Sequence, residues 1–151
     1  MPTQTKHLII DGNNIGRALG DIAMVWRQDR DAGQHAVVGF VRDWHDAMGW
    51  RVTTVFDGKG AALSVETPGD EPTFVVAYAP RGMTADSVIE QWVEKSRAPE
   101  LCVVATRDRA LAETVRALQA EVISPEDLIS WVSRAREVTR RSINRASDSA
   151  W

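Results

Sequence analysis

Long apolar runs are missing from this chain, and so is the layout of a secretory signal peptide. No apolar segment approaches the roughly 20 residues that a membrane-spanning helix needs. The opening residues, M-P-T-Q-T-K, do not place a basic stretch before an apolar one. We therefore expect a cytoplasmic protein.

Cysteine is almost absent. The single cysteine, Cys102, lies within the apolar run L-C-V-V-A, so no disulfide can form within the chain. One cysteine in an apolar run is typical of a buried structural thiol and not of a nucleophile.

Lysine is also rare, because only Lys6, Lys59 and Lys95 stand among 18 basic residues and the rest are arginine. The formal net charge is −3, which does not by itself indicate a nucleic-acid-binding protein. Five arginines nevertheless gather near the C-terminus: Arg134, Arg136, Arg140, Arg141 and Arg145. Such a run is ordinarily a solvated helix end. Because the guanidinium fork suits phosphate, a band that binds an RNA backbone is the alternative.

The residues that are present describe one globular domain. Hydrophobic residues make up 44% of the 151 positions and charged residues 26%, both close to globular averages. Strand-like segments at 7–11, 51–57, 73–79, 101–105 and 121–123 alternate with helix-like segments at 33–48, 84–96, 108–119 and from 125 onward. Residues 58–72, rich in glycine and proline, indicate a long loop.

This alternation predicts an α/β fold, a three-layer sandwich with a central, mainly parallel sheet of about five strands. We expect a single domain over residues 1–146 that ends in a basic helix, followed by a frayed tail at 147–151.

An acid follows each of the first four predicted strands. Asp11 and Asp57 end the first two, while Asp86 and Asp108 open the helices after the third and fourth. Each acid alone could be an ordinary turn or helix-start residue. In a parallel sheet, however, all four junctions lie at the carboxyl edge, where α/β proteins place their ligand sites.

Carboxylates that converge on one edge repel each other and hold raised pKa values unless a cation lies among them. Mg²⁺ is such a cation, since it binds through one or two carboxylates together with substrate phosphate oxygens. Glu90 follows Asp86 by four residues and shares its helical face, so it could join the cluster or face solvent. Two metal ions could activate water and stabilise the leaving oxygen of a phosphodiester.

The ordered motifs D-G-N-N-I, V-F-D, T-A-D-S-V-I-E and V-A-T-R-D resemble the four signatures of the NYN domain, a PIN-like nuclease family, and in particular its YacP-like bacterial branch. The resemblance covers nearly the whole chain. It implies a PIN-like fold and a metal-dependent endoribonuclease that uses Mg²⁺ or Mn²⁺ to cut single-stranded RNA, with translating mRNA at the ribosome as a possible target.

The resemblance also implies roles for individual residues. Asp11, Asp57, Asp86 and Asp108 would be the catalytic acids, with Asp11, Asp86, Asp108 and Glu90 as metal ligands. Asn14 and Thr106 would be polar supports, although Thr106 could equally be only the N-cap of its helix. Two positions depart from the family pattern: Asn13 stands where an aromatic residue is usual, and Ser87 where a second acid often follows.

Two other functions remain open at this point. A PIN-like RNA- or ribosome-binding module without catalysis would not need the full set of acids. A HAD-like phosphatase wants a second Asp two residues after the first, where this chain has Asn13.

The histidines and tryptophans have ordinary interpretations. His7, His35 and His45 do not cluster and are expected in the core or on the surface. The tryptophans on apolar helix faces predict core packing, whereas Trp26 and Trp50, beside predicted loops, could instead stack on bases.

Overall fold

A computed structural model of the protein describes residues 5–149 and contains one six-stranded sheet in the order β3-β4-β2-β1-β5-β6. The strands are β1 (His7–Asp11), β2 (Arg51–Phe56), β3 (Ser64–Glu66), β4 (Phe74–Tyr78), β5 (Cys102–Ala105) and β6 (Glu121–Ile123). Only β3 pairs antiparallel, with β4; the other neighbours are parallel. The carboxyl ends of five strands therefore share one edge.

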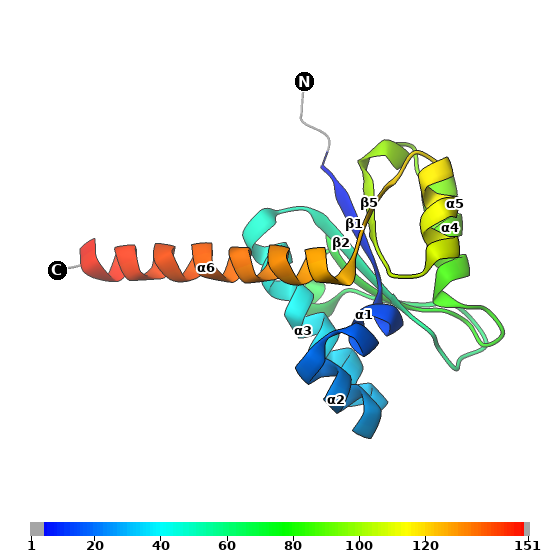
Figure 1. Ribbon diagram of the computed structural model, residues 1–151, viewed down its shortest axis with the longest axis horizontal. Coiled ribbons are helices and arrows are strands. Elements are labelled where there is room, and N and C mark those ends of the chain that lie inside the picture. Colours follow the sequence, from blue (N-terminus) through cyan, green and yellow to red (C-terminus); the bar gives the residue numbers. More distant parts are fainter. Residues whose placement is uncertain (1–4, 150–151) are drawn as a thin grey trace.

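Helices cover both faces of this sheet (Figure 1). They are α1 (Gly12–Ala18), α2 (Gly20–Gln28), α3 (Arg30–Met48), α4 (Ala85–Lys95), α5 (Arg109–Ala117) and α6 (Pro125–Ser149), with short 3-10 turns η1 (Pro68–Asp70) and η2 (Pro99–Leu101). One core packs α1, α3 and α6 against the sheet, and a second core packs α4 and α5 against the other face.

The strand residues alternate between these two cores because successive side chains of a strand point to opposite faces. In β1, Leu8 and Ile10 pack in the first core and Ile9 in the second. In β5, Val103 faces the first core and Val104 the second. The strands are buried on both faces, and this explains why they read as continuous apolar runs.

The predicted three-layer α/β sandwich is confirmed, and all five predicted strands are present. The sheet has a sixth strand, β3, inside the predicted loop 58–72, so the description of that segment as a loop was wrong in this part. Its three residues are all exposed, and β3 forms by edge pairing to β4. An exposed strand of that length leaves no apolar alternation in the sequence.

Residues 12–28 form two helices for which the sequence pattern predicted no element. The seven residues of α1 contain two glycines and two asparagines, and α2 buries none of its residues. The composition of α1 hides its helical character. In α2, however, Ile22, Val25 and Trp26 stand at helical spacing, so this helix could have been predicted from the sequence. The helix α3 begins earlier than predicted, at Arg30, where the Asp29 side chain accepts a hydrogen bond from the Ala32 N–H.

The last helix, α6, begins as its sequence predicts. The Ser124 hydroxyl oxygen accepts a hydrogen bond from the Asp127 N–H at 3.1 Å, as an N-cap should. Leu128 and Val132 are fully buried, but residues 136–147 are almost entirely exposed, and this part of the helix projects from the body (Figure 1). It is helical through Ser149, so the predicted tail starts within the helix, and residues 150–151 lie outside the described residues.

The tryptophans that could have stacked on bases pack within the protein instead. Trp50 lies edge-on to Trp44 at 5.0 Å and to Trp131 at 6.0 Å between ring centroids. The ring of Trp26 lies so close to Gly16 and Gly33 that a Cβ on either glycine would meet it within 3 Å. Both side chains thus belong to packing between helices.

Cys102 is a buried free thiol, as expected, and its burial raises its pKa. Within residues 5–149, none of the helices combines the length and the apolar character that crossing a membrane requires.

Candidate active site

The four acids predicted at strand ends all line one cavity of about 330 Å³ at the carboxyl edge of the sheet. They arrive there from different elements, as the last residue of β1, the residue after β2, the second residue of α4 and the residue before α5. The lining is completed by polar and small residues: Asn13, Asn14, Arg17, Ala18, Thr84, Ala85 and Arg107.

Asp11 is the most deeply placed of the acids, with only 4% of its surface exposed. Its Oδ2 accepts a hydrogen bond of 3.1 Å from the Thr106 hydroxyl, and the Asn14 backbone N–H donates a further one. Burial nevertheless raises the pKa of this carboxyl above its ordinary value, and the charge of Asp57 adds to the rise.

Asp86 lies between two other acids. It is within hydrogen-bond range of both Asp11 and Asp108. Burial, followed by the neighbouring charges of these two carboxylates, raises the pKa of Asp86 to about 7. Asp86 thus has a carboxylate neighbour on each of two other segments, which is the electrostatic condition expected of a cation site.

Asp108 combines a structural contact with its place in the cavity. Its Oδ1 accepts a hydrogen bond of 2.9 Å from the Leu111 N–H and so caps α5. Thr106 is therefore not the cap of this helix. Its hydroxyl oxygen instead accepts a 3.0 Å hydrogen bond from the Asp108 N–H while donating to Asp11. One threonine thus fixes the positions of two of the acids.

Asp57 has a protein group close to each of its two carboxylate oxygens. Oδ1 accepts a 2.8 Å hydrogen bond from the Ala85 N–H at the start of α4, and Oδ2 lies 4.0 Å from the Arg30 guanidinium. Asp57 holds the helix that carries Asp86, so it is placed to position this acid.

Asn13 is a support that the sequence pattern did not identify. Its side chain is buried, and Oδ1 accepts a 2.9 Å hydrogen bond from the Asp57 N–H, which joins α1 to the end of β2. Asn14, which was predicted as a support, accepts a 2.7 Å hydrogen bond from the Arg107 N–H. The two adjacent asparagines thus tie the first acid-bearing loop to two others.

Two arginines line the cavity, and neither was predicted to be there. The Nε of Arg17 donates to the Asn13 carbonyl oxygen at 3.2 Å, and the guanidinium of Arg107 pairs with Glu126. No ion pair joins either arginine to Asp11, Asp86 or Asp108 in the described part of the chain. The sequence offered one indication of their position. Arg17 lies on the segment that follows Asp11, and Arg107 directly precedes Asp108.

Several predicted site residues lie elsewhere. Glu90 is half-buried on α4 and does not line the cavity. None of the five arginines of α6 lines it either. Two of those arginines, Arg140 and Arg141, pair with Glu137, and Arg136 pairs with Asp43 at 2.8 Å.

The donor set of the acidic cavity fits a hard divalent cation. Carboxylates are ligands that Mg²⁺ and Mn²⁺ prefer, and Mg²⁺ keeps waters and substrate oxygens beside one or two of them. The open space of the cavity leaves room for such additional ligands. The pKa values of Asp11 and Asp86 are raised because their charged forms are disfavoured, and a bound cation would stabilise those charged forms.

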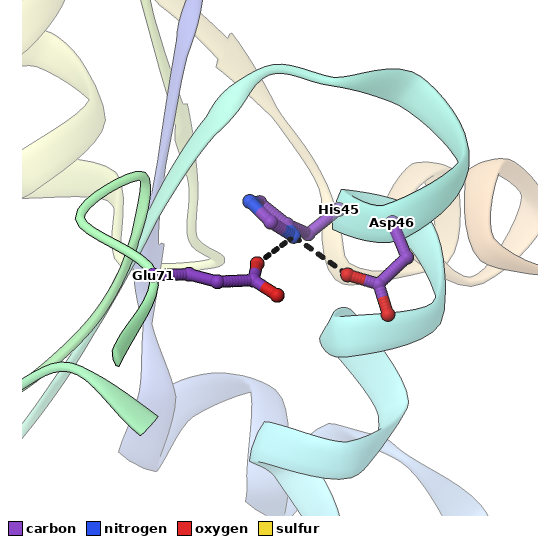
Figure 2. Close-up of side chains that lie close together, drawn as sticks. All are labelled: His45, Asp46 and Glu71. Carbon is purple, nitrogen blue, oxygen red and sulfur yellow. Dashed lines mark hydrogen bonds and ion pairs between the residues drawn. The ribbon is translucent and has the colours of Figure 1, made fainter. Parts of the chain in front are cut away.

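A second group of metal-binding residue types lies away from this cavity, where the end of α3 meets the segment before β4 (Figure 2). It consists of His45, Asp46 and Glu71, whose ligand atoms lie within 4.8 Å of one another. The Nδ1 atom of His45 is 2.9 Å from Asp46 Oδ1 and 3.7 Å from Glu71 Oε2.

Protein groups already satisfy this second cluster. The Arg42 guanidinium lies 3.2 Å from Glu71 and 3.7 Å from Asp46 and supplies the positive charge that a metal ion would bring. The Nε2 atom of His45 is 3.0 Å from the Thr73 hydroxyl. The cluster therefore connects α3 to the sheet, and His45 is a core histidine, as the sequence suggested.

The model of the YacP-like NYN domain matches residues 8–150 of the chain. The chain belongs to the YacP-like NYN family. Membership of this family supports a nuclease-like function related to RNA.

Solved structures show the same fold. The crystal structure of Rae1 (YacP) from Bacillus subtilis superposes with a TM-score of 0.78 at 20% identity, covering 98% of this YacP-like chain and 84% of that one. A variant of Rae1 with one tryptophan replaced by leucine gives a TM-score of 0.78 at 18% identity, covering 95% and 85% of the two chains. The fold is thus YacP-like, while a search of curated proteins gave no match.

Proposed function

We propose that this protein is a metal-dependent endoribonuclease that hydrolyses phosphodiester bonds in single-stranded RNA. The observation that carries the proposal is the acidic cavity, in which Asp86 lies within hydrogen-bond range of Asp11 and Asp108 and has a pKa raised to about 7. Among the described residues, these three acids have no ion-pair partner. Such a cluster in a YacP-like NYN domain is suited to binding Mg²⁺ or Mn²⁺.

Each acid has a separate task in this proposal. Asp11, Asp86 and Asp108 would hold the cation, and Thr106 keeps Asp11 and Asp108 in place through its two hydrogen bonds. Asp57 positions the start of α4. When bound, the cation supplies Lewis-acid stabilisation of the phosphate charge and makes a water molecule more acidic.

The RNA backbone would meet positive charge at two places. Arg17 and Arg107 line the cavity and can contact the phosphates that flank the scissile one. The arginines of α6 would hold more distant phosphates along the projecting helix. We further propose translating mRNA at the ribosome as the natural substrate, because the YacP-like family resemblance implies it.

The two alternative functions are less well supported. A HAD-like phosphatase needs a second reactive acid at position 13, whereas Asn13 is buried and bonded to the Asp57 backbone. A binding module without catalysis would gain nothing from three acids that repel each other.

A direct test uses an end-labelled, unstructured RNA with and without Mn²⁺. We expect internal cleavage with Mn²⁺, none with a chelator, and a loss of at least about 100-fold in rate for Asp86→Asn, comparable to losing a major electrostatic contribution. The matched control is Glu90→Gln, which changes the next acid on the same helix. Because Glu90 does not line the cavity, this variant should cut at the wild-type rate, and a large loss of rate would support the predicted role of Glu90 as a metal ligand. Cleavage of a phosphomonoester in place of RNA would support the phosphatase, and RNA binding without cleavage would support the inactive module.

The ribosome is tested separately. Translating ribosomes are added to the same RNA carrying an open reading frame, and cleavage is compared with that of free RNA. Faster, position-specific cutting would support ribosome-associated mRNA as the substrate, whereas equal rates would contradict it.

A further inference from the structure

A second cavity, of about 430 Å³, adjoins the acidic one. The two share Asp57, which lines both. The second cavity lies among the start of α3, the loop after β2 and the ends of β3 and β4. Its lining includes the side chains of Arg30, Asp31, Gln34, Lys59, Ser64 and Tyr78.

Several polar groups of this second cavity have no partner among the residues that the structure describes. Among residues 5–149, no hydrogen bond or ion pair engages the Gln34 amide, the Lys59 ammonium group or the Tyr78 hydroxyl. Polar groups that converge on one cavity without internal partners are the ordinary means by which a protein recognises a small polar ligand.

The Tyr78 side chain is held firmly despite its free hydroxyl. Its ring stacks on Phe56 with 5.8 Å between centroids and an interplanar angle of 26°, and Phe56 is fully buried. Burial, aided by the charges of Glu66 and Asp31, raises the pKa of Tyr78. The hydroxyl therefore stays protonated at neutral pH and can donate a hydrogen bond.

The wall of the second cavity is also fixed at the backbone. The Ala79 N–H donates to the Phe56 carbonyl oxygen at 2.8 Å, and the Arg81 N–H donates to the Gly60 carbonyl oxygen at 2.7 Å. A Cβ on Gly58 would come within 2.3 Å of the Ala79 carbonyl oxygen, so glycine is required for this approach. The loop that carries Lys59 is thus built against the strand that carries Tyr78.

Arg30 lies at the border between the two cavities. Its guanidinium is 4.0 Å from Asp57, and both side chains are about half exposed. Exposed ion pairs contribute little to stability, so Arg30 can exchange this contact for a phosphate at small cost. The same guanidinium lies over the Trp26 ring at 5.9 Å, which limits where it can move.

We propose that the second cavity is a nucleotide subsite that reads the base next to the scissile phosphate. This inference rests on the proposed endoribonuclease function. The cavity has the volume of a small-ligand pocket. Asp31 and Gln34 stand three residues apart on α3 and present a carboxylate and an amide to the edge of a base. Arg30 and Lys59 supply positive charge for its phosphate.

Base preference is the property to measure, because a purely structural role of these residues would not change it. An RNA pool with randomised sequence is cut in Mn²⁺, and the bases on either side of each cut are counted for the wild type and for a Gln34→Ala/Tyr78→Phe double variant. Gln91→Ala, an exposed glutamine on α4, is the matched control. The change of melting temperature on adding Mn²⁺ is measured for every variant.

We expect the wild type to prefer one base at one position beside the cut. In the double variant the ratio of cuts beside this base to cuts beside the others should fall about tenfold, as for a lost bidentate base contact. Its response to Mn²⁺ should stay that of the wild type. Cleavage by the double variant with the wild-type preference would overturn the subsite and leave the nuclease function standing, as would a wild type that cuts without preference. A wild type that binds Mn²⁺ but never cuts RNA would overturn both.

Discussion

At the scale of single residues, Thr106 shows how a small polar side chain organises a charged site. Its hydroxyl donates to Asp11 and accepts from the backbone of Asp108, so one oxygen atom fixes the acids of two different strand ends. The adjacent Asn13 and Asn14 do the same for Asp57 and Arg107. The acids repel each other, and these neutral residues hold them together.

The raised pKa of Asp86 predicts an unusual pH dependence of stability in the absence of metal. The folded-state pKa of about 7 lies above the ordinary value of 3.8, so the unfolded chain loses this proton first as the pH rises. The contribution of this group therefore destabilises the native state progressively between about pH 4 and pH 7. We expect urea denaturation in a chelator to give a smaller stability difference between pH 5 and pH 8 for Asp86→Asn than for the wild type.

Saturating Mn²⁺ provides the control for this experiment. A bound cation competes with the proton on Asp86, so the metal should stabilise the wild type more at pH 8 than at pH 5. Equal stabilisation at the two pH values would contradict the assignment of Asp86 as a ligand.

At the scale of elements, the loop between β2 and β3 depends on one glycine. Gly58→Ala places a methyl group against the Ala79 carbonyl oxygen, at 2.3 Å without relaxation. We expect a loss of about 1–3 kcal/mol in the free energy of unfolding, measured by chemical denaturation. The control is Gly39→Ala on α3, where a Cβ meets nothing within 4 Å. Since glycine weakens a helix, this change should stabilise by roughly 0.5–1 kcal/mol.

The projecting half of α6 is the element whose role in RNA binding is most open to test. If its arginines contact phosphates, replacing Arg140, Arg141 and Arg145 together with Gln should weaken binding to all RNAs alike. The slope of log K against log salt should then flatten by roughly two, at about 0.7 per lost contact on a single strand. Binding curves of the wild type and the variant over a range of salt concentrations measure this.

A triple change of other basic residues, Lys95, Arg97 and Arg116 to Gln, serves as the matched control. It removes the same charge from other exposed positions, on and beside α4 and on α5. Equal slopes for the wild type and the α6 variant would identify the arginine-rich helix end as a solvated surface.

At the scale of the whole molecule, a cation that binds only the folded chain must stabilise it. At a hundredfold excess over Kd this is worth about 2.7 kcal/mol. For a chain of this length the melting temperature should rise on the order of 5–10 °C with Mn²⁺. Asp11→Asn should abolish this rise, as measured by thermal unfolding with and without the metal.

The same measurement distinguishes the acidic cavity from the cluster of His45, Asp46 and Glu71. Glu71→Gln removes one potential ligand there, and the Arg42 guanidinium loses a partner. We expect this variant to melt at a lower temperature but to keep the full response to Mn²⁺. A lost response in Glu71→Gln, with Asp11→Asn unaffected, would move the metal site to the second cluster.

The sequence by itself determined the layers of this protein and the strand ends at which its acids lie. Apolar runs that are buried on both faces alternate with segments whose apolar residues have helical spacing, and both patterns can be read within a short stretch of sequence. The five strands other than β3 could therefore be predicted. So could the sheet edge that holds Asp11, Asp57, Asp86 and Asp108. It could not reveal β3, whose three residues are all exposed, or α1, which is short and contains two glycines and two asparagines.

Only the tertiary structure decided how the acids divide their tasks. Asp57 accepts a hydrogen bond from the Ala85 N–H, which is 28 positions further along the chain. Its own N–H donates to Asn13, which lies 44 positions earlier. The same holds for the cavity beside Asp57, whose walls come from four separate elements. Spacing along the chain carries no information about such contacts, because the relative placement of the elements is set by core packing.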